Sequence, residues 1–123
     1  MVQPGETFIG LDFQNHLWII LSLPTAQGTI AVANLTTHGK SSCGAECVVV
    51  SVGEHPYVIR ESCMYYRGAY LNPLAPLERA KEQGFRQSDP FVDPVLFRLQ
   101  QGALASRFVT PVVSEAIRRT LRP

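Results

Sequence analysis

The first half of the chain consists of short apolar runs whose composition is typical of β-strands. Residues 7–13 alternate between apolar and polar positions, which predicts a strand with one buried face. Residues 16–23 are a nearly continuous apolar run, as in a strand that is buried on both faces, and residues 29–35 predict a third strand. A fourth run, residues 47–52, is rich in valine, and residues 57–60 and 62–66 predict two further short strands.

Helical signals replace strand signals near residue 70. Residues 71–76 contain two prolines and predict an irregular crossing segment. Residues 77–83 predict a short helix that Gly84 ends, because glycine adopts the left-handed conformation that commonly follows a helix.

Two more helices are predicted downstream, each from a polar residue followed by proline. The second helix starts at Ser88-Asp89-Pro90 or at Asp93-Pro94 and runs to about Leu104, since proline is favourable in the first turn. Thr110-Pro111 repeats this start signal. An apolar stripe typical of one buried helix face follows it, at Val113, Ile117 and Leu121.

Length and composition predict one domain with one hydrophobic core. The chain has 123 residues, of which 46% are hydrophobic and only 17% are charged, so it carries enough apolar side chain to fold. Five or six short strands with brief connections predict a small barrel or curled sheet. The expected fold is therefore α+β and mainly β, with a β-barrel body over residues 1–70 and a helical extension over residues 71–123.

Charge and hydropathy favour a cytoplasmic location and do not indicate a binding partner. The formal net charge of +1 creates no long-range field, so any nucleic-acid site must be a local cluster of cations. The longest apolar run, residues 17–21, is far shorter than the roughly 20 residues of a membrane-spanning helix. Residues 1–6 have neither the basic region nor the apolar stretch of a signal peptide, which favours the cytoplasm and no membrane partner.

Three cysteines, Cys43, Cys47 and Cys63, are an odd number that does not suit a disulfide framework. Free thiols are the expectation for a reducing compartment. The three cysteines could form a zinc site together with His38, but their spacing is loose, and small buried side chains are the favoured interpretation. We therefore expect no metal and no cofactor.

Candidate chemistry is confined to the ends of the predicted strands. The chain lacks a glycine-rich phosphate loop, paired C-x2-C motifs, a G-x-S-x-G elbow and H-E-x-x-H. Polar and titratable residues remain where strands begin or end. They are His16, Thr36, Thr37, His38, His55, Arg60, Tyr65, Tyr66 and Arg67. In a small barrel such positions can converge on one rim.

Several of these residues lie in motifs that resemble MazF/PemK toxins, and a divergent PemK-like branch in particular. The chain carries His16-Leu17-Trp18-Ile19-Ile20-Leu21-Ser22, and a second hydrophobic strand that ends in Asn34-Leu35-Thr36-Thr37. Gly53-Glu54-His55-Pro56-Tyr57 and the tyrosine-containing strand Cys63-Met64-Tyr65-Tyr66 follow in the order seen in that branch. The similarity spans roughly residues 8–69, and its specificity lies in the order and spacing of the motifs.

The resemblance implies an SH3-like barrel of the MazF, PemK and CcdB type. It further implies the toxin of a type II toxin–antitoxin system, a homodimer that cleaves single-stranded RNA without a metal and is blocked by a cognate antitoxin protein. His16 stands at the position that usually holds the toxin's catalytic arginine, and the usual G-D-hydrophobic-W opening is absent. Histidine can act as acid or base near neutral pH, whereas arginine mainly supplies charge.

The expected catalytic residues are His16, Thr36, Thr37 and Arg60. His16 is assigned acid or base chemistry, the two threonines hold the scissile phosphate, and Arg60 or Arg67 stabilises the developing charge. The expected RNA-binding residues are His38, Lys40, Tyr65 and Arg67. Only one of Tyr65 and Tyr66 can face a groove, because consecutive strand residues point to opposite faces.

Structural roles remain open for each of these side chains. His16 could end a turn, Thr36 and Thr37 could satisfy local backbone groups, and His55 could hold the His-Pro turn rather than serve as a reserve acid or base. The alternative function is a binding protein: an inactive or protein-targeting barrel, such as a topoisomerase poison or a phage-related interaction module. Such a protein would not need His16, Thr36 and Arg60 to converge.

Overall fold

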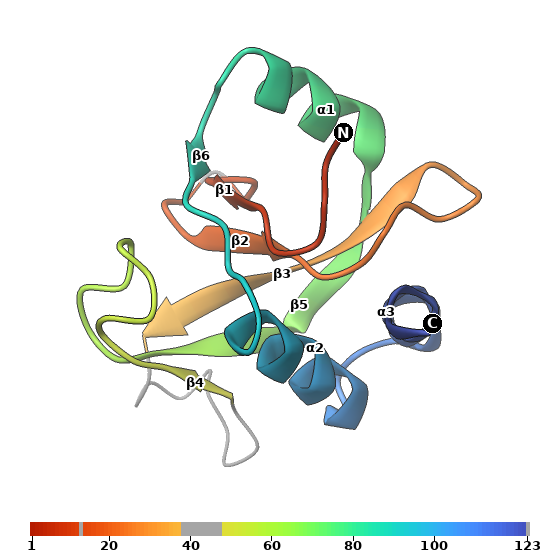
Figure 1. Ribbon diagram of the computed structural model, residues 1–123. Coiled ribbons are helices and arrows are strands. Elements are labelled where there is room, and N and C mark those ends of the chain that lie inside the picture. Colours follow the sequence, from red (N-terminus) through yellow and green to blue (C-terminus); the bar gives the residue numbers. More distant parts are fainter. Residues whose placement is uncertain (13, 38–47, 123) are drawn as a thin grey trace.

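Six strands form one antiparallel sheet that curls into a half-barrel, and three helices accompany its C-terminal part (Figure 1). This computed structural model describes residues 1–12, 14–37 and 48–122. The sheet order is β4-β5-β3-β2-β1-β6. The elements are β1 (Thr7–Ile9), β2 (Leu17–Ile20), β3 (Thr29–Thr37), β4 (Val49–Val50), β5 (Ser62–Pro73), α1 (Leu74–Glu82), β6 (Gln87–Ser88), α2 (Val95–Ala105) and α3 (Pro111–Leu121). The expected mainly-β α+β class is confirmed.

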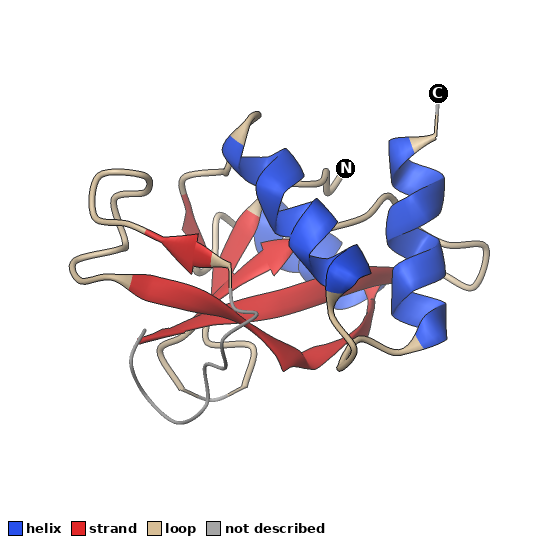
Figure 2. Cartoon of the chain, turned by 90° about the horizontal axis from the view of Figure 1, so that it is seen from below, coloured by secondary structure: helices blue, strands red, loops and turns tan. Residues whose placement is uncertain are grey.

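The β2–β3 pair is buried on both faces, as the continuous apolar run of residues 16–23 predicts for β2. Leu17 and Ile19 belong to a core that includes residues of α2 and α3, whereas Trp18 and Ile20 belong to a second core that includes Leu77 of α1. Figure 1 shows α1 on one side of the sheet and the other two helices on the opposite side. Viewed from below, α2 and α3 lie in front of the strands (Figure 2). Each fully buried aliphatic side chain contributes about 1.5–3 kcal/mol, so this pair anchors the fold.

Strand β5 is much longer than predicted. Leu71 and Asn72 lie opposite Ala31 and Ile30 in β3, so the sheet continues through residues expected to form a crossing segment. Its register with β3 shifts at a bulge, which explains why the sequence pattern appears to stop near Tyr66. Pairing with the first residues of β3 compensates for the weak local strand signal.

Residues 57–60, predicted to form a strand, are instead part of a loop held by His55. The His55 ring is buried and stacks on Phe91 with centroids 4.6 Å apart. Its Nδ1 accepts the backbone N–H of Tyr57 at 3.1 Å, and its Nε2 is therefore the protonated nitrogen that donates to the carbonyl of Asp89. Both ring nitrogens are used, so His55 holds the turn and is not a reserve acid or base.

The C-terminal half follows the predicted start signals and adds one strand that the sequence did not indicate. Helix α1 begins at Leu74, three residues before the predicted start, and α2 follows Asp93-Pro94, the second of its two predicted starts. Helix α3 begins at Pro111, as predicted. Strand β6 pairs with Thr7 and Phe8 of β1, and a run of two residues is too short to be recognised from the sequence.

One cysteine expectation is wrong. Cys63 is buried and disulfide-bonded, rather than a free thiol. An odd number of cysteines argues against a complete framework but does not prevent one pair from forming. Cys43, Cys47 and His38 lie outside the described residues.

The packing of α2 against β5 predicts an unusual response to a glycine substitution. Replacing a helical glycine with alanine normally stabilises a protein by about 1 kcal/mol. A Cβ on Gly102 would collide with Val48 and with the hydroxyl of Tyr66, which donates to the carbonyl of Leu99 at 2.7 Å. We expect Gly102→Ala to lower the free energy of unfolding by about 1–3 kcal/mol in urea denaturation.

The neighbouring residue supplies the control for this substitution. Gln101 is exposed in the same helix, and Gln101→Ala should leave the free energy of unfolding nearly unchanged. A Gly102→Ala variant as stable as the wild type would contradict this packing.

Candidate active site

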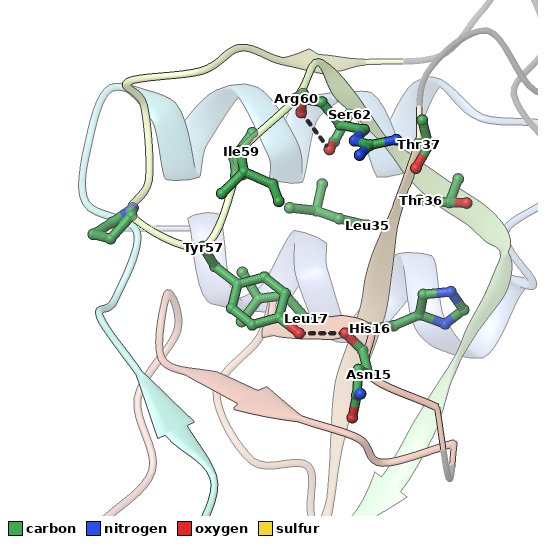
Figure 3. A pocket seen from close by; sticks show the side chains of 12 residues that line it. Asn15, His16, Leu17, Leu35, Thr36, Thr37, Tyr57, Ile59, Arg60 and Ser62 are labelled. Carbon is green, nitrogen blue, oxygen red and sulfur yellow. Dashed lines mark hydrogen bonds between the residues drawn. The ribbon is translucent and has the colours of Figure 1, made fainter.

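A pocket of about 530 Å³ lies where β2 begins and β3 ends (Figure 3). The two strands are antiparallel neighbours, so the start of β2 and the end of β3 lie side by side. The loop before β5 forms the opposite wall. The lining residues are Asn15, His16, Leu17, Leu35, Thr36, Thr37, Pro56, Tyr57, Val58, Ile59, Arg60 and Ser62. All four residues expected to be catalytic are among them.

His16 lines the pocket and has a carboxylate partner. Its Nδ1 lies 2.6 Å from Oδ2 of Asp12, and the His16 side chain is 33% exposed. Burial opposes ionisation of Asp12, but the contacts from His16 and Trp18 and the backbone N–H of Gln14 hold the pKa of Asp12 below its ordinary value. Because an ionised carboxylate only accepts hydrogen bonds, Nδ1 carries the proton. Nε2 makes no hydrogen bond within the described part of the chain, and in the neutral ring it carries the lone pair.

Trp18 lies beside Asp12. It is buried, and its ring meets the Tyr70 ring edge to face at a centroid distance of 5.6 Å. The indole Nε1 has no hydrogen-bond partner of acceptable geometry among the described residues. Its N–H is close enough to the carboxylate to help lower the pKa of Asp12. The indole thus adds positive potential beside the Asp12–His16 pair.

Thr36 and Thr37 place hydroxyl groups on the two faces of one strand end. Both are half-buried at the end of β3, and consecutive strand residues point to opposite faces. Figure 3 shows Thr36 on the same side of β3 as His16, whereas Leu35 points toward Tyr57 and Ile59. Neither hydroxyl makes a hydrogen bond within the described residues, so both are available to a ligand that wraps the strand end.

Arg60 comes from the loop wall, and its guanidinium extends toward Thr37 (Figure 3). The side chain is exposed and makes no ion pair in the ranges that the structure describes. Its backbone carbonyl accepts a hydrogen bond from the Ser62 hydroxyl at 2.9 Å, which fixes the chain where the loop enters β5. A guanidinium without a carboxylate partner can bind an anion.

The loop between β4 and β5, which forms one wall of the pocket, is held by hydrogen bonds at Tyr57 and at Glu54. The Tyr57 hydroxyl donates to the carbonyl of Asn15 across the pocket. Nη2 of Arg98 lies 2.7 Å from Oε1 of Glu54 and donates to the carbonyl of Val49 at 3.1 Å. The hydrogen bond from Arg98 is the main reason that the pKa of Glu54 lies below its ordinary value. The pocket wall is thus tied to both α2 and β4.

The residues expected to bind RNA are not gathered at this pocket. Tyr65 lies in β5 against Gly68 and Asn34, and it does not line the cavity. The Arg67 guanidinium lies 3.9 Å from the centroid of the Phe108 ring in the loop before α3. His38 and Lys40 lie outside the described residues. Of the four, Tyr65 and Arg67 are therefore described residues that do not line the pocket.

Sequence reasoning missed Asp12 and the apolar wall. Asp12 precedes His16 by four residues, and this spacing alone does not predict a contact in a loop. Ile59 was assigned to a strand, whereas it lines the mouth of the pocket. Both contacts depend on loop conformations that hydrophobic periodicity does not encode.

Comparisons with known proteins found no match. No family model matches it, and no curated protein or solved structure matches it. Among the described residues, no group of three or more histidine, cysteine, aspartate or glutamate side chains could hold a metal ion. No helix in the described ranges is long and apolar enough to cross a membrane.

The Asp12–His16 contact predicts a specific pH dependence of stability. Because the folded-state pKa of Asp12 is lowered, its charge stabilises the fold at neutral pH. This contribution is lost as the pH falls through that pKa, below the ordinary value of 3.8. We expect Asp12→Asn to be less stable than the wild type at pH 7, and the difference to shrink in strong acid, as measured by urea denaturation across pH.

Glu82 supplies a matched control for this experiment. It is exposed at the end of α1 and makes no hydrogen bond within the described residues, so Glu82→Gln should have little effect at pH 7. A difference between wild type and Asp12→Asn that stays constant with pH would show that the contact does not depend on charge.

Proposed function

We propose that this protein is a metal-independent endoribonuclease that cleaves single-stranded RNA in the pocket at the ends of β2 and β3. One observation carries the proposal. Three separate segments line a single cavity with His16 and its carboxylate partner, with Thr36 on the same side of β3, and with Thr37 and Arg60 around the end of that strand. RNA cleavage by its own 2′-hydroxyl needs these groups: a base, hydrogen-bond donors to phosphate and a cation beside the phosphorane.

In the proposed reaction, the 2′-hydroxyl oxygen attacks the adjacent phosphorus and displaces the 5′-oxygen of the next nucleotide. Nε2 of His16 accepts the proton of the 2′-hydroxyl, and Asp12 stabilises the imidazolium that forms. Thr36, on the same side of β3 as His16, donates a hydrogen bond to a non-bridging oxygen, and Arg60 reaches around the strand end beside Thr37 to neutralise the added charge. The leaving 5′-oxygen takes a proton from water. The products are a 2′,3′-cyclic phosphate and a 5′-hydroxyl, and no electrons are transferred to or from the protein.

The biological class that fits this chemistry is the toxin of a type II toxin–antitoxin system. The proposal includes a PemK/MazF-like, SH3-like barrel that forms a homodimer in the cytoplasm and is restrained by a cognate antitoxin protein. The curled antiparallel sheet and the motif order along β2, β3 and β5 support it. His16 in place of the usual arginine makes proton transfer, rather than charge alone, the main contribution of that position.

Cleavage assays on purified variants test the proposal. A long single-stranded RNA is incubated with the protein in excess chelator, and the cut ends are mapped. We expect discrete cuts with 2′,3′-cyclic phosphates, a rate loss of about 10²–10⁴-fold in His16→Ala and a loss of about 10²–10³-fold in Arg60→Ala.

Arg79 provides the control for charge removal, because it is exposed in α1 and does not line the pocket. Arg79→Ala should cleave at the wild-type rate. If the folded wild-type protein leaves the RNA intact, the nuclease proposal is wrong, and a binding protein with the same fold is favoured.

A further inference from the structure

We propose that the apolar half of the pocket binds one nucleobase next to the scissile phosphate, with Ile59 as the residue that contacts it. This inference rests on the proposed function. It adds a ligand for the part of the cavity that the cleavage chemistry does not use.

The pocket has two chemically different halves. Leu17, Leu35 and Val58 are buried residues that line it without any polar side-chain atom. Tyr57 and Ile59 extend this apolar lining from the loop, and Figure 3 shows them on the same side of β3 as Leu35. His16 and Thr36 lie on the other side. A ligand that matches both halves has an anionic group joined to an apolar, flat group, as a nucleotide does.

Ile59 is the most exposed large hydrophobic side chain in the described part of the chain. It is 80% exposed at the mouth of the pocket, and Val52 on the same loop is 61% exposed. A single exposed aliphatic residue is ordinary in a folded protein. Of these two, only Ile59 lines the cavity, where it can cover a ligand that rests on Leu35 and Tyr57. Ligand binding would then remove the apolar surface of Ile59 from water, which favours the complex.

The apolar wall is held in place before any ligand arrives. The Tyr57 hydroxyl is bonded to the carbonyl of Asn15, and the Val58 N–H donates to the carbonyl of His55 at 3.0 Å. His55 is itself buried and bonded through both ring nitrogens. A preformed wall loses little conformational entropy on binding, which favours a rigid planar partner such as a base.

The chemistry of the wall also predicts how the base is recognised. Aliphatic and aromatic surfaces contact the π-face that every base has, and they do not read the hydrogen-bonding edge. The pocket should therefore accept all four bases with similar affinity, and it should reject a nucleotide that has no base. The size of the cavity, about 530 Å³, is within the range of small-ligand sites.

Binding to short single-stranded DNA oligonucleotides, which lack the 2′-hydroxyl that attacks the phosphorus, tests this inference without cleavage. One abasic nucleotide is placed at each position in turn, and dissociation constants are measured for wild type, Ile59→Ser and the control Val52→Ser. We expect one position at which the abasic change weakens wild-type binding about 10-fold. Ile59→Ser should bind the complete oligonucleotide about 10-fold more weakly and show no further loss at that position.

The control variant and the outcomes that overturn the base-binding inference are as follows. Val52→Ser should behave as the wild type with every oligonucleotide. The inference is overturned if Ile59→Ser binds as tightly as the wild type, if the two losses multiply, or if the wild type binds no oligonucleotide. The proposed nuclease fails separately, if the wild type shows the predicted coupling in these binding experiments but leaves ordinary RNA uncut.

Discussion

The burial of β2 and β3 on both faces is the constraint on which the rest of the structure depends. Leu17 and Ile19 fill one core while Trp18 and Ile20 fill the other, so no position within the pair can hold an exposed polar group. A shift of one residue would exchange the two cores, which fixes the register strongly. Titratable side chains can therefore appear only where the pair ends. His16 and Thr36 occupy those ends, and the pocket lies there.

The two described histidines of the pocket region show how surroundings decide the role of a residue type. His55 is buried, stacked on Phe91 and bonded through both nitrogens, so it holds the loop in place. His16 is partly exposed and bonded through Nδ1 alone, which leaves Nε2 toward a ligand. The first histidine fixes the wall of the pocket, and the second supplies a group that can move a proton.

Features governed by local periodicity could be predicted from the sequence. The apolar runs at residues 16–23 and 29–35 predicted β2 and β3, and the Thr110-Pro111 start signal predicted α3. The far end of β5 and the short β6 could not be predicted, because each depends on a partner strand distant in sequence. For the site, the strand ends identified His16, Thr36, Thr37 and Arg60. Asp12 and the apolar wall escaped prediction because they depend on loop conformation, and Arg67 lies in the part of β5 where the register with β3 shifts, which the sequence pattern does not reveal.

The central claim is that the end of the β2–β3 pair binds RNA through the His16 side chain. Two-dimensional ¹H–¹⁵N spectra of the histidine rings, recorded as a 2′-deoxy oligonucleotide is added, test it most directly. The account predicts that the His16 ring resonances shift with saturation, while those of the buried His55 ring stay in place. Saturable binding that leaves the His16 resonances unmoved would contradict the account, since the nucleic acid would then lie elsewhere on the protein.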